Sequence, residues 1–349
     1  MRTRARTVYA QSQLGRWLRG KWRLERVLGV GGTSAVFAAR HRNGARVAIK
    51  LLHPELAEDA RLRARFLREA PMANLVCHPA VVRVLDDDDS DDQPFLVLEL
   101  VEGRTLAELT DVLPLEQREL LEIADQLLGA LSVAHAVGIV HRDIKPQNLV
   151  LDERHRLRVL DFGLARLIEE DAMRSLLTSV NDVWGTLEYM APEQLTGIDE
   201  ITVRADVYAV GATLFRLASG QYVYEAAHSR ERVLKTLNTP ARSLATATDR
   251  FDPAVVRLVD RATLPRASER WQSAQEMLDE VQRLHAPARN SGRRMRAASE
   301  PPIDAPTRRD RPPLRLEEDS DGVTTPSGEF PGLLGPGGVF SGQRVQGSA

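Results

Sequence analysis

Two short motifs place two carboxylates and one amide on loops that lie near each other along the chain. The first, HRDIKPQN at residues 141–148, follows an apolar stretch, and the second, DFG at residues 161–163, follows a predicted short hairpin. Asp143 and Asp161 supply the carboxylates and Asn148 supplies the amide. Oxygen donors of this kind hold divalent cations, and a carboxylate also accepts the proton of an attacking hydroxyl. The spacing predicts a site for metal ions and a nucleophilic hydroxyl group.

A glycine-rich segment, LGVGGTSAV at residues 28–36, lies between two strand-like runs. Glycines let backbone N–H groups approach a ligand closely, as a cradle for phosphate groups requires. Ser34 stands where a third glycine of GxGxxG would be, and a strand rather than a helix follows, which excludes the dinucleotide-binding form. Taken alone, the segment is more typical of a tight hairpin turn.

One cation and one anion are expected to face inward in the first part of the chain. Lys50 shares a strand face with Ala48, and Glu69 lies three residues after Phe66 on the inward side of a helix predicted over 60–70. A buried charge is costly unless it is paired or bound to a counterion. We therefore expect Lys50 and Glu69 to form an ion pair with each other. A purely structural salt bridge is the alternative interpretation.

The elements that must position these residues change character along the chain. Residues 45–52 alternate between two faces, as in a strand, and the runs 81–85 and 95–101 predict a hairpin with an acidic connector over 86–92. A strand-rich part followed by a helical part predicts an α+β fold of two lobes with a cleft between them. Helical spacing predominates from about residue 115, for example over 120–137, 205–219 and 271–284.

Composition excludes several classes of protein. The chain has 47 Lys plus Arg against 49 Asp plus Glu, a net charge of −2, which is not the basic footprint of a nucleic-acid binder. The single cysteine, Cys77, excludes a disulfide framework and favours a reducing compartment, so we expect a cytoplasmic protein. No apolar run reaches the roughly 18 residues that a membrane span needs.

Both ends of the chain differ from its middle. Residues 1–20 are rich in arginine and lack a helical stripe, so we expect a disordered basic extension; an arm attracted to membranes is the alternative. Residues 286–349 hold nine prolines and nine glycines, a composition typical of a disordered segment. The folded domain is expected over residues 21–285.

Two further motifs follow in order, GTLEYMAPE at residues 185–193 and DVYAVG at residues 206–211. With all these motifs in this order, residues 22–284 resemble the catalytic domain of a eukaryotic-type (Hanks-type) serine/threonine protein kinase. The GGTS form of the glycine-rich loop resembles the bacterial branch. The resemblance implies a bilobal protein-kinase-like fold, with an antiparallel sheet and one helix in an N-lobe (about 21–99) and a mainly helical C-lobe (about 102–285).

The resemblance also implies a nucleotide site in the cleft. The glycine-rich loop would cover the phosphates of ATP, Val36 and Ala48 would lie over adenine, and Leu98 would be the gatekeeper before the hinge, Glu99–Val101. The residues implied in ATP binding are Leu28, Gly29, Val30, Gly31, Gly32, Thr33, Ser34, Ala35, Val36, Ala48, Lys50, Glu99 and Val101.

The remaining motif residues are implied in catalysis. Asp143 would accept the proton of the substrate hydroxyl, Lys145 would contact the γ-phosphate, and Lys50 would hold the α- and β-phosphates. The cofactor would be Mg²⁺ or Mn²⁺. The implied catalytic residues are Asp143, Lys145, Lys50 and Glu69, and the implied metal ligands are Asn148 and Asp161.

Activation by phosphorylation is a further implication of the resemblance. Arg142 places a cation directly before Asp143 and invites an anion, which a phosphorylated loop over 164–189 would supply. Thr178 is the first candidate for autophosphorylation in this loop and Ser179 is the second.

Three residues bear on the rigidity of the domain. Glu193 and Arg270 match a structural ion pair of the family. Pro71 follows Glu69 by two residues and is expected to kink or end the helix just after Glu69, because proline lacks an N–H and clashes with the preceding turn.

The expected function is a protein serine/threonine kinase that acts in signal transduction, with ATP and proteins bearing serine or threonine hydroxyls as its substrates. A homodimer through the N-lobe is a further expectation. The alternatives are a pseudokinase that serves as an ATP-binding scaffold, and a small-molecule kinase of the aminoglycoside type. Lys145 and the APE element at residues 191–193 disfavour the small-molecule kinase.

Overall fold

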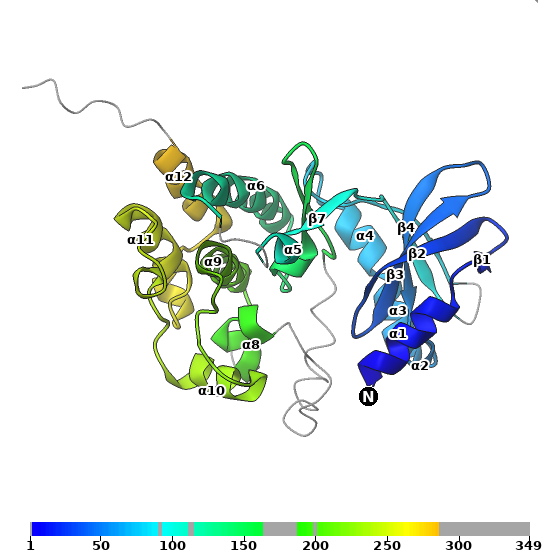
Figure 1. The fold of residues 1–349 in the computed structure, drawn as a ribbon, viewed down its shortest axis with the longest axis horizontal. Coiled ribbons are helices and arrows are strands. Elements are labelled where there is room, and N and C mark those ends of the chain that lie inside the picture. The colour runs from blue at the N-terminus through cyan, green and yellow to red at the C-terminus, as the bar shows by residue number, and fades with distance from the viewer. Residues whose placement is uncertain (1, 90–92, 111–114, 163–186, 198–200, 286–349) are drawn as a thin grey trace, which may run out of the picture. The chain divides into compact units, whose positions relative to one another are not determined.

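A computed structural model shows the fold of the chain (Figure 1). It describes residues 2–89, 93–110, 115–162, 187–197 and 201–285. The expected disordered tail over 286–349 lies outside the described residues.

A six-stranded antiparallel sheet forms the first part of the fold, in the strand order β1-β2-β3-β4-β6-β5. The central strands β3 and β4 are apolar on both faces, so both faces are covered and side chains such as Phe37 and Ile49 are fully buried. Strand β5 extends into the expected acidic connector. The strands are β1 (Trp17–Leu18), β2 (Trp22–Val30), β3 (Ser34–His41), β4 (Arg46–Leu52), β5 (Val84–Asp88) and β6 (Phe95–Leu98).

The register of the sheet decides which side chains share a face. Lys50 pairs with Val36 on one side and with Leu96 on the other, and the next residues on this face are Ala48 and Leu98. Residues opposite each other in a sheet point to the same face, and successive residues alternate. Lys50 therefore lies in an apolar row on one face of the sheet.

The single helix expected over residues 60–70 is divided in two. Helix α3 (Ala60–Leu67) is capped by the Asp59 side chain and ends before Arg68, and α4 (Glu69–Asn74) follows. Pro71 has no N–H to donate to the Leu67 carbonyl, and its ring would clash with that carbonyl in a continuous helix. The row of helical hydrogen bonds therefore breaks within the turn before Pro71. The break therefore precedes Glu69, whereas the sequence predicted one just after it. A short helix α2 (Pro54–Ala57) comes before both.

The N-terminal residues are ordered, in contrast to the disorder expected over 1–20. Helix α1 (Arg2–Ser12) lies beside the sheet (Figure 1), and β1 pairs with β2. Ala10 is fully buried, the Arg6 guanidinium lies 2.9 Å from Glu55, and the Tyr9 hydroxyl donates to Gln93 at 2.9 Å. The helix is held mainly by polar contacts to residues that are distant in the sequence. Such contacts do not require an apolar stripe, which is why the sequence of the helix gave no sign of it.

The second part of the fold is mainly helical, as expected. Helix α9 is apolar on nearly all sides and is buried along its length, and Gly211 lets it approach α11, because a Cβ there would lie 2.6 Å from the Cβ of Ala262. The helices are α5 (Leu106–Thr110), α6 (Gln117–Ala136), α8 (Pro192–Thr196), α9 (Val203–Ser219), α10 (Ser229–Asn238), α11 (Pro253–Ala262) and α12 (Ala274–His285). A three-stranded sheet, β7 (Gly103–Thr105), β8 (Leu149–Asp152) and β9 (Leu157–Val159), lies beside them.

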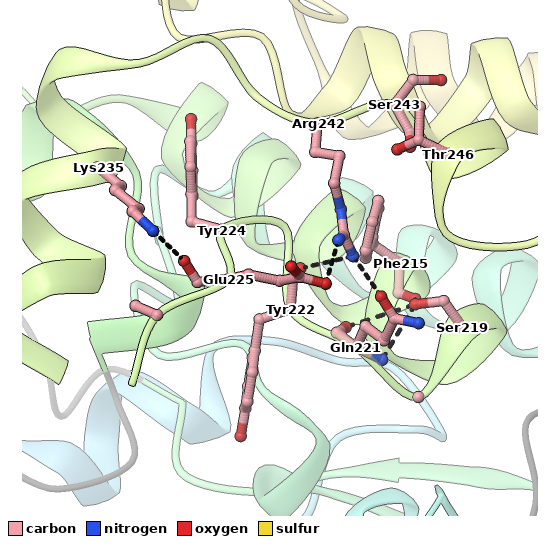
Figure 2. Close-up of polar contacts among 12 residues, drawn as sticks. Phe215, Ser219, Gln221, Tyr222, Tyr224, Glu225, Lys235, Arg242, Ser243 and Thr246 are labelled. Atoms are coloured by element: carbon pink, nitrogen blue, oxygen red, sulfur yellow. Dashed lines mark hydrogen bonds and ion pairs between the residues drawn. The ribbon is translucent and has the colours of Figure 1, made fainter. Parts of the chain in front are cut away.

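The segment after α9 is held by the Arg242 side chain (Figure 2). This guanidinium donates to the carboxylate of Glu225 and, at 2.7 Å, to the amide oxygen of Gln221. The segment presents the Tyr222 ring, over which Arg216 and Arg232 lie at 4.8 and 4.2 Å from the ring centroid. Arg232 also donates to Glu188 at 2.9 Å, so these contacts connect α9 to α10 and to the residues that precede α8.

Glu193 of α8 and Arg270 form a buried bidentate ion pair, with N–O distances of 2.7 and 2.8 Å. The Arg270 side chain is fully buried, and it also donates to the carbonyl oxygens of Leu264, Pro265 and Arg204. Every charged group in this cluster is therefore compensated.

Replacing Arg270 with methionine should lower the free energy of unfolding by about 3–5 kcal/mol, because it leaves the Glu193 carboxylate buried without its cation. Urea denaturation followed by fluorescence measures the change. The matched control is Arg266→Ala, which removes a surface ion pair with Glu269 and should leave stability nearly unchanged. Equal losses in the two variants would contradict the prediction.

No helix among the described residues combines the length and the apolar character that crossing a membrane requires.

Candidate active site

A cavity of about 910 Å³ lies between the six-stranded sheet and the helical part of the chain. The sheet contributes one wall, the segment after β6 closes one end, and residues from the HRDIKPQN motif (141–148) and β8 form the opposite wall. The cavity brings together fifteen residues that the sequence singled out: Leu28, Gly29, Val30, Gly31, Gly32, Ser34, Val36, Ala48, Lys50, Leu98, Glu99, Val101, Lys145, Asn148 and Asp161.

Two residues of the glycine-rich segment do not line the cavity. Ala35 is 1 % exposed and packs in the core on the other face of the sheet, because side chains alternate along β3. Thr33 accepts a hydrogen bond from the His53 backbone through its carbonyl oxygen.

Several apolar residues of the cavity walls were missed by the sequence analysis, although it named Val36, Ala48 and Leu98. Val82, Leu96, Val150 and Leu160 line it together with Phe162 of the DFG motif. The first four lie in or beside the strand-like apolar runs of the sequence. Alternation signals a strand in such runs, but it does not say which face meets a ligand.

A buried ion pair joins the two walls of the cavity. The Lys50 ammonium on β4 lies 2.7 Å from the Asp161 carboxylate, and the Lys50 side chain is only 3 % exposed. Burial by itself would raise the pKa of Asp161, but the positive charge of Lys50 and its hydrogen bond outweigh burial and lower this pKa below its usual value. Asp161 is therefore ionised at neutral pH.

Several expected site residues fall outside the described part of the chain. The Glu69 side chain is one of them, so its pairing with Lys50 stays a prediction. The candidate phosphorylation sites Thr178 and Ser179 are the others.

Asp143 is held by two neighbours from its own motif. The Lys145 ammonium donates to both carboxylate oxygens, at 2.9 and 2.7 Å, and the Asn148 amide nitrogen donates to the Asp143 side chain at 2.8 Å and to its carbonyl at 2.9 Å. Both bonds from Asn148 use Nδ2, so the amide oxygen Oδ1 is the atom suited to a cation. This geometry fixes a carboxylate beside the cavity and an ammonium next to it.

The loop over residues 141–148, called the catalytic loop below, is anchored by a residue whose role the sequence analysis missed. Asp206 of α9 is fully buried and accepts from the backbone N–H groups of His141 and Arg142 and from the His135 ring, at 2.7–2.8 Å. Burial would raise the pKa of Asp206, but the His135 hydrogen bond and the nearby positive groups lower it. The sequence analysis named Asp206 only as the first residue of the DVYAVG motif and gave it no partner.

Two backbone positions in the site have left-handed conformations that residues other than glycine rarely adopt. They are Arg142, with φ of 66°, and Asp161, with φ of 59°. The Gln194 side chain donates to the Arg142 carbonyl at 3.0 Å, and His141 packs against the Phe162 ring with centroids 4.6 Å apart. These surrounding contacts hold the strained loops in place.

The segment after β6 is fixed to the opposite wall. Arg158 of β9 makes two hydrogen bonds to the Glu99 carboxylate, at 3.0 and 2.6 Å, and these hold the pKa of Glu99 below its usual value. Gly103 follows, where a Cβ would lie 2.4 Å from the Leu151 carbonyl oxygen. Only glycine fits this close approach of the two strands.

Comparison with known proteins identifies the family. Residues 22–295 match the protein kinase domain, so the chain belongs to the protein kinase family. It is 37 % identical over 279 residues to serine/threonine-protein kinase pkn2 of Myxococcus xanthus, and 34 % identical over 266 residues to serine/threonine-protein kinase PrkC of Bacillus subtilis. These alignments cover 77 % and 76 % of this chain, but only 33 % and 40 % of the relatives, so the chain spans well under half of their length.

A solved structure shares the fold. The kinase domain of PknI from Mycobacterium tuberculosis superposes with a TM-score of 0.58 at 26 % sequence identity, and the match covers 77 % of this chain and 98 % of that one. The bilobal α+β architecture expected from the sequence is confirmed.

Replacing Asp206 with asparagine should slow phosphate transfer at least tenfold. The two carboxylate oxygens each accept one backbone N–H, and asparagine replaces one of these oxygens with an NH₂ group that cannot accept, so one of the bonds that shape the loop over 141–148 is lost. It should also change the dependence of stability on pH. A lowered carboxylate pKa contributes stability above its ordinary value of 3.8, and that stability is lost as the pH falls through the folded pKa. The melting temperature, measured by thermal unfolding between pH 7 and pH 3, should fall less in the variant than in the wild type.

The control for this prediction is Asp249→Asn, at an exposed carboxylate. A pH profile of Asp206→Asn that matches both the wild type and this control would show that Asp206 does not carry the linkage.

Proposed function

We propose that this chain is an active serine/threonine protein kinase, which transfers the γ-phosphate of ATP to serine and threonine hydroxyls of proteins. One observation supports this most strongly: a carboxylate, Asp143, is held beside a nucleotide-sized cavity by a lysine and an asparagine, while a second carboxylate, Asp161, is ionised by contact with Lys50. A scaffold that only binds nucleotide has no need of the Asp143 cluster.

The proposed reaction is a direct displacement at phosphorus. Asp143 accepts the proton as the O–H bond of the substrate breaks, the hydroxyl oxygen forms a bond to the γ-phosphorus, and the bond to the bridging oxygen breaks to release ADP. Lys145, held next to Asp143, offsets negative charge on the phosphoryl group in transfer. Lys50 holds the phosphates that do not react, so the nucleotide stays aligned.

The donor set suits magnesium. Among the described residues no cluster of three or more histidine, cysteine or acidic side chains gathers, which disfavours a site built from protein ligands alone. Asn148 and Asp161 offer two oxygen ligands, and Mg²⁺ is typically held by one or two carboxylates together with substrate phosphates and water. When bound, the ion would neutralise charge on the phosphates.

The first test is phosphate transfer from labelled ATP to the chain itself and to a generic basic protein. Lys50→Met and Asp143→Asn should each lower the rate by about 10²-fold or more, since one removes the phosphate contact and the other the proton acceptor. Asp249→Asn, at an exposed carboxylate, should retain the wild-type rate. Equal rates in the wild type and both site variants would refute the proposal, and nucleotide binding without transfer would favour the pseudokinase.

We further infer that the kinase activates itself by phosphorylation at Thr178 or Ser179, with Arg142 as the cation that receives the phosphate. Peptide mapping by mass spectrometry after incubation with Mg²⁺ and ATP should find phosphate in the loop over 164–189. Thr178→Ala combined with Ser179→Ala should lower the rate of substrate phosphorylation at least tenfold. A loop that carries no phosphate in active wild-type protein would rule this regulation out.

The remaining expectations rest on the sequence alone. A cytoplasmic location follows from the single cysteine, and an N-lobe homodimer and the lack of a nucleic-acid partner are part of the same proposal.

A further inference from the structure

His53 is a buried histidine that the catalytic mechanism does not use. It follows β4 directly, precedes α2, and is 1 % exposed. Its ring nitrogen Nε2 lies 3.0 Å from the carbonyl oxygen of Gly31, and its backbone N–H donates to the Thr33 carbonyl at 2.9 Å. Both partners belong to the glycine-rich loop, which lines the nucleotide cavity.

The turn of this loop is tied at three points. The Gly31 N–H donates to the Ser34 carbonyl at 2.8 Å, and the two bonds to His53 hold the peptide groups of Gly31 and Thr33 from behind. Glycine loses more conformational freedom on folding than any other residue, so a glycine-rich turn needs bonds that hold it in one shape. A loop whose N–H groups must cradle phosphates gains affinity when it is already held in the binding shape.

We propose that His53 is a positioning residue for the nucleotide, and that helix α1 holds in place the segment that carries it. The inference rests on the proposed kinase function, because it concerns the loop that covers the ATP phosphates.

The state of the His53 ring fits this role. Among the described residues Nδ1 has no hydrogen-bond partner, so the hydrogen lies on Nε2, where Gly31 accepts it. Burial lowers the pKa of His53, the Gly31 carbonyl opposes this, and the nearby Arg6 cation lowers the pKa further against the weaker effect of Glu55. The ring is therefore neutral at neutral pH and donates through Nε2.

Side chains of helix α1 are connected to both sides of the His53 segment, directly at Glu55 and through Gln93 at Leu52. On one side, the Tyr9 hydroxyl donates to Gln93 at 2.9 Å, and the Gln93 amide donates to the Leu52 carbonyl at 2.6 Å. On the other side, Arg6 donates to the Glu55 carboxylate at 2.9 Å. Leu52 and Glu55 flank His53, so the helix braces the residue from both directions.

This brace lies outside the part of the chain that matches the family. The matched region begins at residue 22, and α1 ends at Ser12. The helix is thus an addition to the kinase domain whose polar contacts converge on the residue that holds the glycine-rich loop.

The test compares two substitutions of His53 by steady-state kinetics. His53→Leu fills the buried space but removes the donor, and should raise the KM for ATP about three- to tenfold, the size of one lost hydrogen bond, while kcat changes less than about twofold. His53→Gln keeps a donor at the position of Nε2 and should restore the KM. The control is His78→Leu, at a half-buried histidine away from the cavity, which should leave the KM for ATP unchanged.

A thermodynamic cycle tests the role of α1. The double substitution Arg6→Ala with Tyr9→Phe should raise the KM for ATP in the wild-type background about threefold, and should have no further effect in His53→Leu, because coupled residues are not additive. Effects that multiply would show that α1 acts independently of His53 and would overturn that half of the proposal.

Two further measurements test the role of His53 without relying on the kinase assay and without confusing it with a loss of folding. Nitrogen-15 NMR of the folded wild-type protein should show His53 protonated on Nε2 alone; a hydrogen on Nδ1 with Nε2 bare would overturn the assignment. Calorimetry with ATP should show weaker binding by His53→Leu. A wild type that binds no ATP would refute the proposed function, whereas equal binding by both proteins would refute only the role of His53.

Discussion

The need to compensate one buried cation organises this molecule. Lys50 stands in an apolar row on the central strand of the sheet, where an isolated charge would be prohibitively costly. Its ion pair with Asp161 reaches across 111 residues and joins the sheet to the loop after β9. The cavity exists where these two walls meet, so the contact that stabilises the charge also defines the site. The same contact keeps Asp161 ionised in a left-handed backbone conformation.

A second set of buried polar groups supports the loops that carry the chemistry. Asp206 projects from an apolar helix and accepts the backbone N–H groups of His141 and Arg142, and Gln194 binds the carbonyl of Arg142. The Glu193–Arg270 pair lies beside them. A helix packed on all sides cannot shift to give an unpaired polar group another hydrogen-bond partner. Asp206 and Gln194 therefore each specify one geometry of the loop that they bind. The positions of Asp143 and Asn148 follow from this support.

The glycine-rich loop needs support of a different kind, because its own residues supply little packing. His53 provides it through hydrogen bonds to Gly31 and Thr33, and the N-terminal helix holds the segment that carries His53. This helix could not be predicted from the first 20 residues, since Ala10 is the only apolar side chain of α1 that is fully buried. Its contacts are with Glu55 and Gln93, which are distant in sequence. The composition of residues 1–20 thus favoured disorder, whereas the structure shows a helix over residues 2–12 and a short strand at 17–18.

The sequence by itself determined the fold class, the family and the helices α6, α9 and α12 to within a few residues, because periodicity and contiguous motifs are local properties of the chain. It also predicted about half of the residues that line the cavity, including Lys145 and Asn148, which lie close to Asp143 along one loop. Only the tertiary structure decided that α3 ends before Arg68, that Ala35 faces away from the cavity, and that Asp161 is a partner of Lys50. Those outcomes depend on which groups, distant in the sequence, meet inside the protein. A buried charge without a partner is costly, so the arrangement that pairs the charges is favoured. Such pairings produce no periodic pattern in the sequence.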